Sequence, residues 1–161
     1  MATHQVNRVA ALAVAAAEFL AYGEAYMAQI VSNAKALGRA LQERGFFVLG
    51  AHKGYTETHQ VIVDAQSLGG GYEASNQLAR ANIITNKNLI PSDRADDWDF
   101  PGGIRLGTTE VTRLDMKEPE MAEIADLMAA VLLKRQPTDA IRSRVRALRA
   151  DFQHLHYCFE V

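Results

Sequence analysis

The first 45 residues constrain the fold most, because their apolar side chains recur at the spacing of an α-helix. Between residues 6 and 44 the apolar positions fall close to a 3.6-residue period. Gly23 is a position where such a helix can bend or divide, and Gly45 is well placed to end it with a positive φ. We therefore expect residues 1–45 to form one long helix or a helix pair.

Short segments with strand character follow, separated by helical and turn segments. Strands are expected at 46–49, 59–64, 82–85 and 104–107, and helices near 72–81, 117–133 and 139–152. This alternation is typical of an α/β (α+β) two-layer sandwich, in which a small sheet carries helices on one face. We expect residues 1–161 to be a single domain, with the long helix preceding a small α/β domain at 46–161.

The composition argues against several classes of function. The net charge is −2 and the sequence pI is about 6.2, so no nucleic-acid partner is expected. The single cysteine, Cys158, rules out an internal disulfide and a site of several thiolates, and it fits a cytoplasmic location. We expect no metal site. The apolar run 10–17 is shorter than the about 20 residues of a membrane helix, so we expect a packed helix and no membrane partner.

Arg105 stands on an expected strand, between the glycines of the run Pro-Gly-Gly-Ile-Arg-Leu-Gly-Thr at 101–108. On a strand, Arg105 and Gly107 share one face, while Ile104 and Leu106 share the other. A guanidinium there can hold a carboxylate through two parallel hydrogen bonds, and the flanking glycines would let a small substrate come close. From the spacing alone, an exposed, solvated arginine is the better interpretation.

Two amides and a lysine, Asn86, Lys87 and Asn88, come at the end of the expected third strand, where ligand-binding side chains commonly lie. Asparagine amides both donate and accept hydrogen bonds, as recognition of a heterocycle requires, but they also favour turns. Lys87 lies between polar residues at a loop edge, where it would not be desolvated as a Schiff-base lysine must be. We therefore do not expect it to bind a cofactor.

Two other segments are expected to make packing contacts. Trp98 and Phe100 are the bulky apolar residues of the polar loop 92–103, and they either pin the loop to the body or contact a partner. The tail after Phe152 alternates apolar and polar residues. We expect it to pack on this domain or on a neighbour.

Several of these runs resemble the small domain of serine hydroxymethyltransferases. The run Gly-Ile-Arg-Leu-Gly-Thr at 103–108, continued through Val-Thr-Arg at 111–113 to Met121, is similar to the signature of that family. Residues 86–93, 59–64 and 31–37 resemble the same family in the same order. The resemblance covers nearly the whole chain and looks closer to the archaeal-type, α-methylserine and threonine-transaldolase-like branches. It implies the C-terminal small domain of a fold-type I, aminotransferase-like enzyme that uses pyridoxal 5'-phosphate.

The resemblance also implies roles for individual residues. Arg105 would pair with the α-carboxylate of the amino-acid substrate. Asn88 would contact the pterin of a folate cosubstrate, and Leu89 and Pro91 would shape that pocket. Tetrahydrofolate or another pterin is therefore a candidate cosubstrate.

The parts of the family that hold the cofactor have no counterpart in these residues. The cofactor lysine, the aspartate at the pyridine nitrogen and the phosphate-binding residues belong to a large domain that precedes the small one in the family. Thr58 and His59 stand where the family has an Asn-His pair, and no catalytic role is assigned to them. We expect neither catalytic nor cofactor-binding residues in this chain.

The expected function is that of a small-domain subunit in a split hydroxymethyltransferase or transaldolase. A partner chain would carry pyridoxal phosphate in a heteromer, and the chain alone would not be competent. Two alternatives remain. One is a non-catalytic or regulatory homologue that binds a full-length enzyme or an amino acid without chemistry, and the other is a fragment of a longer gene.

Overall fold

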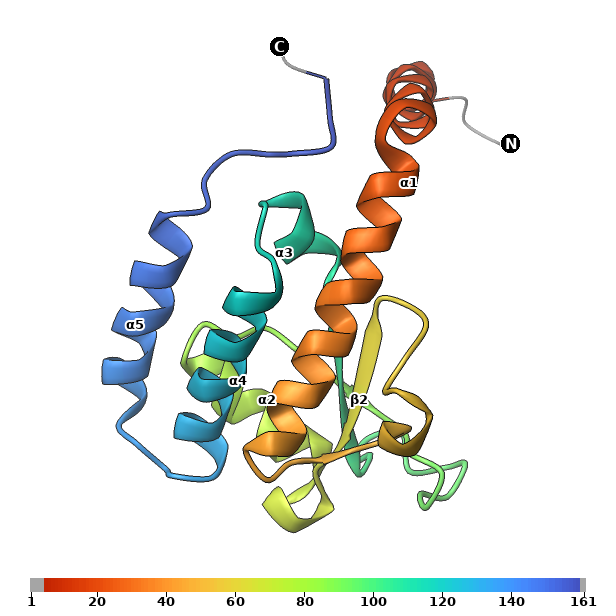
Figure 1. Ribbon diagram of the computed structural model, residues 1–161. Helices are drawn as coiled ribbons and strands as arrows, with labels where there is room; N and C mark the ends of the chain where they lie inside the picture. Colours follow the sequence, from red (N-terminus) through yellow and green to blue (C-terminus); the bar gives the residue numbers. More distant parts are fainter. Residues whose placement is uncertain (1–4, 160–161) are drawn as a thin grey trace.

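The computed structural model describes residues 5–159, which form one four-stranded antiparallel sheet and a layer of α-helices (Figure 1). The elements in chain order are α1 (Val6–Glu43), β1 (Phe47–Val48), the short 3-10 helix η1 (Ala51–Lys53), β2 (Gln60–Asp64), η2 (Gln66–Leu68), α2 (Gly70–Arg80), β3 (Asn86–Asn88), β4 (Gly103–Gly107), α3 (Thr109–Arg113), α4 (Glu118–Leu132) and α5 (Thr138–Ala150). The two-layer α/β sandwich with a long N-terminal helix is confirmed. Residues 1–4 and 160–161 of the expected domain lie outside the described residues.

Helix α1 is continuous over 38 residues, so Gly23 does not divide it. Figure 1 shows its first turns nearly end-on, so the axis bends within the N-terminal half, where Gly23 lies. The helix ends at Glu43 with Arg44 as its C-cap, and Gly45 has the expected positive φ of 96°. Its buried side chains begin only at Tyr26. The expectation that the first part of this helix is packed is therefore wrong within the described residues.

The sheet has the order β1-β2-β4-β3, and each neighbouring pair is antiparallel. The register of β2 and β4 places Val61 opposite Leu106 and Val63 opposite Ile104, and all four side chains are buried. Helices α1 and α2 contact this face, α4 packs against α1, and α5 lies outside α4 (Figure 1). The core therefore lies between one face of the sheet and the helices.

The third strand differs from its expected position. Residues 82–85, expected as a strand, form a turn and an irregular connection, in which Asn82 has a φ of +65° and Ile84 is 80% exposed. The left-handed backbone at Asn82 turns the chain out of α2, and pairing with β4 begins only at Asn86, which lies opposite Arg105. The polar tripeptide expected after the strand is itself β3.

A buried hydrogen-bond network joins α1 to the residues that follow β4. Asn33 Nδ2 donates to Thr112 Oγ1 and to the carbonyl oxygen of Met116, both at 2.8 Å. Thr112 Oγ1 donates to the carbonyl oxygen of Thr108 at 2.7 Å, and Thr108 Oγ1 donates to that of Ile30 at 3.0 Å. The three polar side chains are fully buried. Because unpaired buried polar groups are costly, this network fixes α1 against the end of β4.

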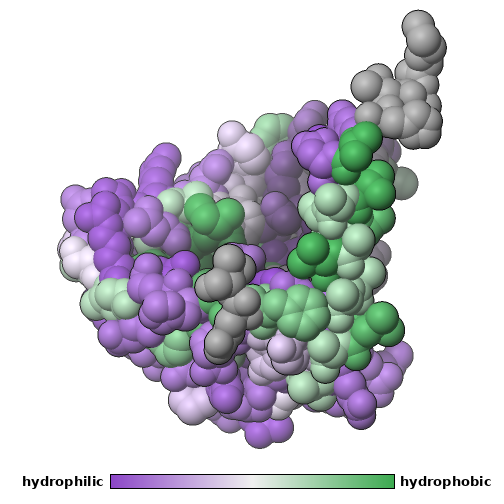
Figure 2. All heavy atoms as spheres, turned by 90° about the horizontal axis from the view of Figure 1, so that it is seen from above, coloured by the Kyte–Doolittle hydropathy of each residue, from purple (hydrophilic) through white to green (hydrophobic). Residues whose placement is uncertain are grey.

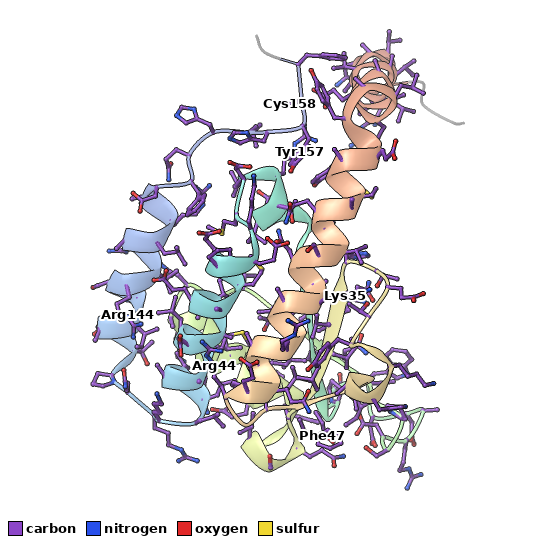
Figure 3. The ribbon with its side chains drawn as sticks, in the orientation of Figure 1. Lys35, Arg44, Phe47, Arg144, Tyr157 and Cys158 are labelled. Atoms are coloured by element: carbon purple, nitrogen blue, oxygen red, sulfur yellow. The ribbon has the colours of Figure 1, made fainter. Side chains whose placement is uncertain are left out.

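The C-terminal tail packs on α1 and α3, as expected. The ring of Tyr157 stacks on that of Tyr26, with centroids 5.0 Å apart, and Figure 3 shows Tyr157 beside α1. The backbone N–H of His156 donates to the carbonyl oxygen of Arg113 at 2.7 Å. Arg113 in turn forms an ion pair with Glu18 of α1 at 3.0 Å. The tail therefore holds α3 and the middle of α1 together.

Removing the Asn33 amide should destabilise the fold. Asn33→Ala leaves the Met116 carbonyl and the Thr112 hydroxyl without their buried donor, and we expect a loss of about 2–3 kcal/mol in the free energy of unfolding. Denaturant titration measures this change. The control is Lys35→Ala, at an exposed position of the same helix, which should change the value by less than about 0.5 kcal/mol. Equal effects of the two substitutions would contradict the role of the network.

Candidate functional site

The candidate site lies on the face of the sheet opposite to the helices. The register places Asn86 opposite Arg105 and Asn88 opposite Gly103, and on the other side Ile62 of β2 faces Arg105. Residues directly opposite each other share a face, and side chains alternate along a strand. Arg105, Asn86 and Asn88 therefore share this face, with Arg105 and Asn88 as diagonal neighbours.

Arg105 is half-buried and forms no ion pair with another residue of 5–159. Its two cross-strand neighbours, Asn86 and Ile62, carry no charge. The guanidinium N–H groups are therefore available to a carboxylate from outside the described chain. A role of Arg105 in substrate binding stays a prediction.

The loop after β3 folds over one end of the open face. A Cβ atom added to Gly103 would lie 2.3 Å from Ile90 Cγ2 and 3.0 Å from the carbonyl oxygen of Asn88. A glycine is needed at 103 because Ile90 and the backbone of Asn88 fill the place of a side chain. The expectation that this glycine lets a substrate come close is therefore wrong. Gly107 differs, because a Cβ atom there would meet His59 Cδ2 only at 3.8 Å. Open space remains on the Gly107 side.

The three residues expected to form a cosubstrate pocket lie at the end of β3 and in the loop that follows it. Asn88 Nδ2 donates to the carbonyl oxygen of Leu89 at 2.6 Å, which turns its amide toward its own loop. Asn88 and Leu89 are half-buried, whereas Pro91 is exposed. The structure therefore brings Asn88 and Leu89 to the strand that neighbours Arg105. Binding of a pterin there stays a prediction.

Asp93 holds the loop in place, a function that sequence reasoning missed. Its Oδ2 accepts a hydrogen bond from the backbone N–H of Ile90 at 2.9 Å and another from that of Gly102 at 2.7 Å. The hydrogen bond from Ile90 is the largest cause that lowers the pKa of Asp93 below its ordinary value, and the one from Gly102 is the next. The spacing of three residues from Ile90 to Asp93 is the turn signal that could have indicated the first bond.

Two further residues near the site have positions that the sequence did not predict. Asn86, expected within the polar tripeptide after the third strand, lies directly opposite Arg105. Thr58 Oγ1 accepts a hydrogen bond from the N–H of Gln60 at 3.2 Å and so caps β2.

The remainder of the loop 92–103 is attached by an aromatic contact. The rings of Phe100 and Tyr72 meet edge to face, with centroids 5.5 Å apart. Lys87 Nζ lies 5.3 Å from the centre of the Tyr72 ring and donates to the carbonyl oxygen of Asp99 at 2.8 Å. Phe100 thus pins the loop to the body. Trp98 forms no aromatic pair within residues 5–159, so it does not share this role.

The described residues do not fit pyridoxal phosphate by themselves. A Schiff-base lysine needs a desolvated or otherwise activating environment. Every lysine of the chain is exposed: Lys35, Lys53, Lys87, Lys117 and Lys134. Residues 5–159 likewise contain no cluster of three or more His, Cys, Asp or Glu side chains that could hold a metal ion. The open face thus presents the guanidinium of Arg105, while the described residues offer no cofactor site of their own.

Loss of the Asp93 carboxylate should release the loop. We expect Asp93→Ala to raise proteolytic cleavage within 92–103 about five- to tenfold, from a loss of about 1 kcal/mol for two partly exposed hydrogen bonds. Limited proteolysis with mass spectrometry measures the rate. Asp96→Ala is the control, since the only ion pair of Asp96 within residues 5–159 is an exposed one with Arg94. Equal cleavage of both variants would contradict the assignment.

Low pH should release the loop 92–103, as Asp93→Ala does. The pKa of Asp93 is lower in the folded protein, so its contribution is complete above the unfolded-state pKa of about 4 and is lost as the pH falls through the lower folded-state value. Pepsin cleavage of the loop should therefore rise over that interval in the wild-type chain. It should change much less in Asp93→Ala.

Comparison with known proteins matches this chain to one enzyme family. The family model described as serine hydroxymethyltransferase matches residues 3–128. A serine hydroxymethyltransferase of Korarchaeum cryptofilum is 48% identical over 99% of this chain and 37% of its own length. One from Methanocaldococcus jannaschii is 45% identical over 99% of this chain and 38% of its own length. The chain thus spans little more than a third of the relatives it matches.

A solved structure shows the same fold. The L-threonine transaldolase from Pseudomonas fluorescens, in its internal aldimine state, matches with a TM-score of 0.81 and 33% identity, over 91% of this chain and 33% of that one. The expected small-domain fold and the expected archaeal and transaldolase-like relatives are therefore confirmed. The chain belongs to the serine hydroxymethyltransferase family.

Proposed function

We propose that this chain forms the substrate-carboxylate side of a pyridoxal-phosphate-dependent hydroxymethyltransferase or transaldolase. The observation that carries the proposal is Arg105, which is half-buried on the open face and has no ion-pair partner within residues 5–159. Membership of the family supports the class of reaction. Pyridoxal phosphate would be held by a partner chain, because the exposed lysines of this chain do not fit it.

Arg105 would bind the α-carboxylate of a small amino acid through two parallel N–H···O hydrogen bonds. Fixing the carboxylate fixes the rotation of the substrate about its Cα atom, and therefore which bond is aligned for cleavage. Correct orientation of this kind supplies several kcal/mol of the reduction in the barrier. When bound, the cofactor supplies the electron sink for the reaction. The strand pairing on both sides of Arg105 keeps its backbone in place.

The cosubstrate would lie beside this carboxylate site. We place a pterin, such as that of tetrahydrofolate, against Asn88, Leu89 and Pro91, since the first two residues lie next to the Arg105 strand. The loop that carries Leu89 and Pro91 is held by Asp93. A fixed loop lowers the entropy lost when a ligand binds.

The N-terminal half of α1 is the surface that a partner would cover. Its apolar side chains are open to solvent, with Val9 64%, Leu12 68% and Leu20 91% exposed, and Figure 2 shows them as a band along the helix. One window of α1 is long and apolar enough to span a membrane by length and composition alone, with 11% of it buried. We propose a cofactor-carrying protein as the partner, in a cytoplasmic heteromer, because the relatives extend well beyond this chain.

Replacing Arg105 should impair turnover without releasing the cofactor. In a complex reconstituted with a pyridoxal-phosphate-binding large-domain chain, Arg105→Ala should lower kcat/KM for the amino acid by about 100-fold or more. The absorbance of the bound cofactor should be unchanged. Arg105→Lys should recover part of the loss, because it restores the charge but not the planar pair of donors.

The control for this experiment is Arg94→Ala, in the exposed loop, which should change kcat/KM less than twofold. Unchanged turnover in Arg105→Ala would contradict the assignment of Arg105. A complex that contains the cofactor but turns over no amino acid, even with Arg105 intact, would instead favour a non-catalytic or regulatory homologue.

A further inference from the structure

A second hollow lies on the helix side of the sheet, between α5, α4 and the connection 82–85. Its volume is about 660 Å³, which falls within the roughly 300–1,000 Å³ typical of small-molecule sites. Leu106 of β4 lines it, whereas Arg105 points to the opposite face of the same strand. The cavity is therefore separate from the carboxylate site, and the inference below does not rest on the proposed function.

The lining of this cavity is mainly apolar. Met121, Leu127 and Met128 of α4, which are almost fully buried, line it together with Ile83 and Val145. Methionine side chains are flexible and polarizable, so they adapt to apolar ligands of different shape. An apolar tail in this space would remove both its own surface and the cavity wall from water, which favours binding.

One buried hydroxyl in the lining lacks a hydrogen-bond partner. Thr85 Oγ1 is inaccessible to solvent and forms no hydrogen bond with another residue of 5–159. Thr85 lines the cavity. Buried hydroxyl groups are normally paired, because leaving one unpaired is destabilising. Because this oxygen has no accessible surface, a molecule in the cavity would not contact it, and the polar groups open to a ligand lie at the rim.

The rim of the cavity carries two arginines of α5. Arg146 and Arg149 lie three residues apart on neighbouring positions of the helix surface, and both line the cavity. Neither forms an ion pair within the part of the chain that the structure describes, although Arg149 Nη1 donates to the carbonyl oxygen of Phe152. Arg142 of the same helix, in contrast, pairs with Asp139 at 3.2 Å. Of the three arginines of α5 without an ion pair within residues 5–159, Arg146 and Arg149 line the cavity, whereas Arg144 lies outside it.

We propose that this cavity binds a small amphipathic carboxylate, which is a carboxylic acid with an apolar tail. The tail lies against Met121, Met128 and Leu127, and the carboxylate accepts hydrogen bonds from Arg146 and Arg149 at the rim. Charge complementarity at the rim selects an anion. The apolar lining rejects small polar anions, which would lose their hydration without compensation.

Isothermal titration of the full chain with decanoate tests this site. We expect saturable binding with one molecule per chain. Arg146→Ala and Arg149→Ala should each weaken it about three- to tenfold, as expected for a partly exposed charge-assisted contact. The matched control is Arg144→Ala, on the same helix (Figure 3) but outside the cavity lining, which should change the affinity less than twofold. Absence of saturable binding, or equal effects of all three substitutions, would overturn the proposal.

The location and the charge preference are tested separately. The methyl NMR signals of Met121 and Met128 should shift with decanoate, and that of Met27, an exposed residue of α1, should not. Ile83→Trp should fill the space and abolish binding. Decyltrimethylammonium should not compete with decanoate. The proposal would be overturned if that cation competed with decanoate or if the signal of Met27 shifted equally. It would also be overturned if adding a cofactor-carrying chain released decanoate, because a polypeptide segment would then occupy the cavity.

Discussion

The buried chain of hydrogen bonds from Asn33 through Thr112 and Thr108 is the interaction on which the rest of the structure depends. It ties the middle of α1 to the residues directly after β4, at a point where no water can replace a lost donor. The position of β4 determines in turn which side chains face the helices and which face outward. A helix more than 70 positions away in the sequence therefore fixes the strand that carries Arg105.

Strand β4 separates two chemically different sites. Leu106 points into the apolar cavity beneath α5, while Arg105 points to the open face between Ile62 and Asn86. Neighbouring side chains on a strand cannot exchange faces without a shift in register. The two proposed sites would therefore bind different ligands while sharing one strand. The proposed substrate site needs this rigidity, since a carboxylate is oriented only as well as the guanidinium that holds it.

Features with a local signal could be predicted from the sequence, and features that depend on distant partners could not. The periodicity of α1, its end at Gly45 and the alternation of β2 were all readable. The strand expected at 82–85 was wrong because two isoleucines suggested a strand, while Asn82 adopts a left-handed turn there. The hydrogen bond from the backbone N–H of Gly102 to Asp93 joins residues nine positions apart, so no local pattern predicts it. Likewise, helical periodicity does not reveal that the apolar residues before Tyr26 are exposed.

The central claim is that Arg105 holds the carboxylate of an amino acid whose cofactor is bound by another chain. A crystal structure of the complex with a cofactor-carrying chain and an amino-acid substrate tests it most directly. The account predicts two guanidinium nitrogens of Arg105 at about 2.7–2.9 Å from the two carboxylate oxygens. An Arg105 that pairs with an acidic residue of the partner, while another group binds the substrate carboxylate, would contradict it.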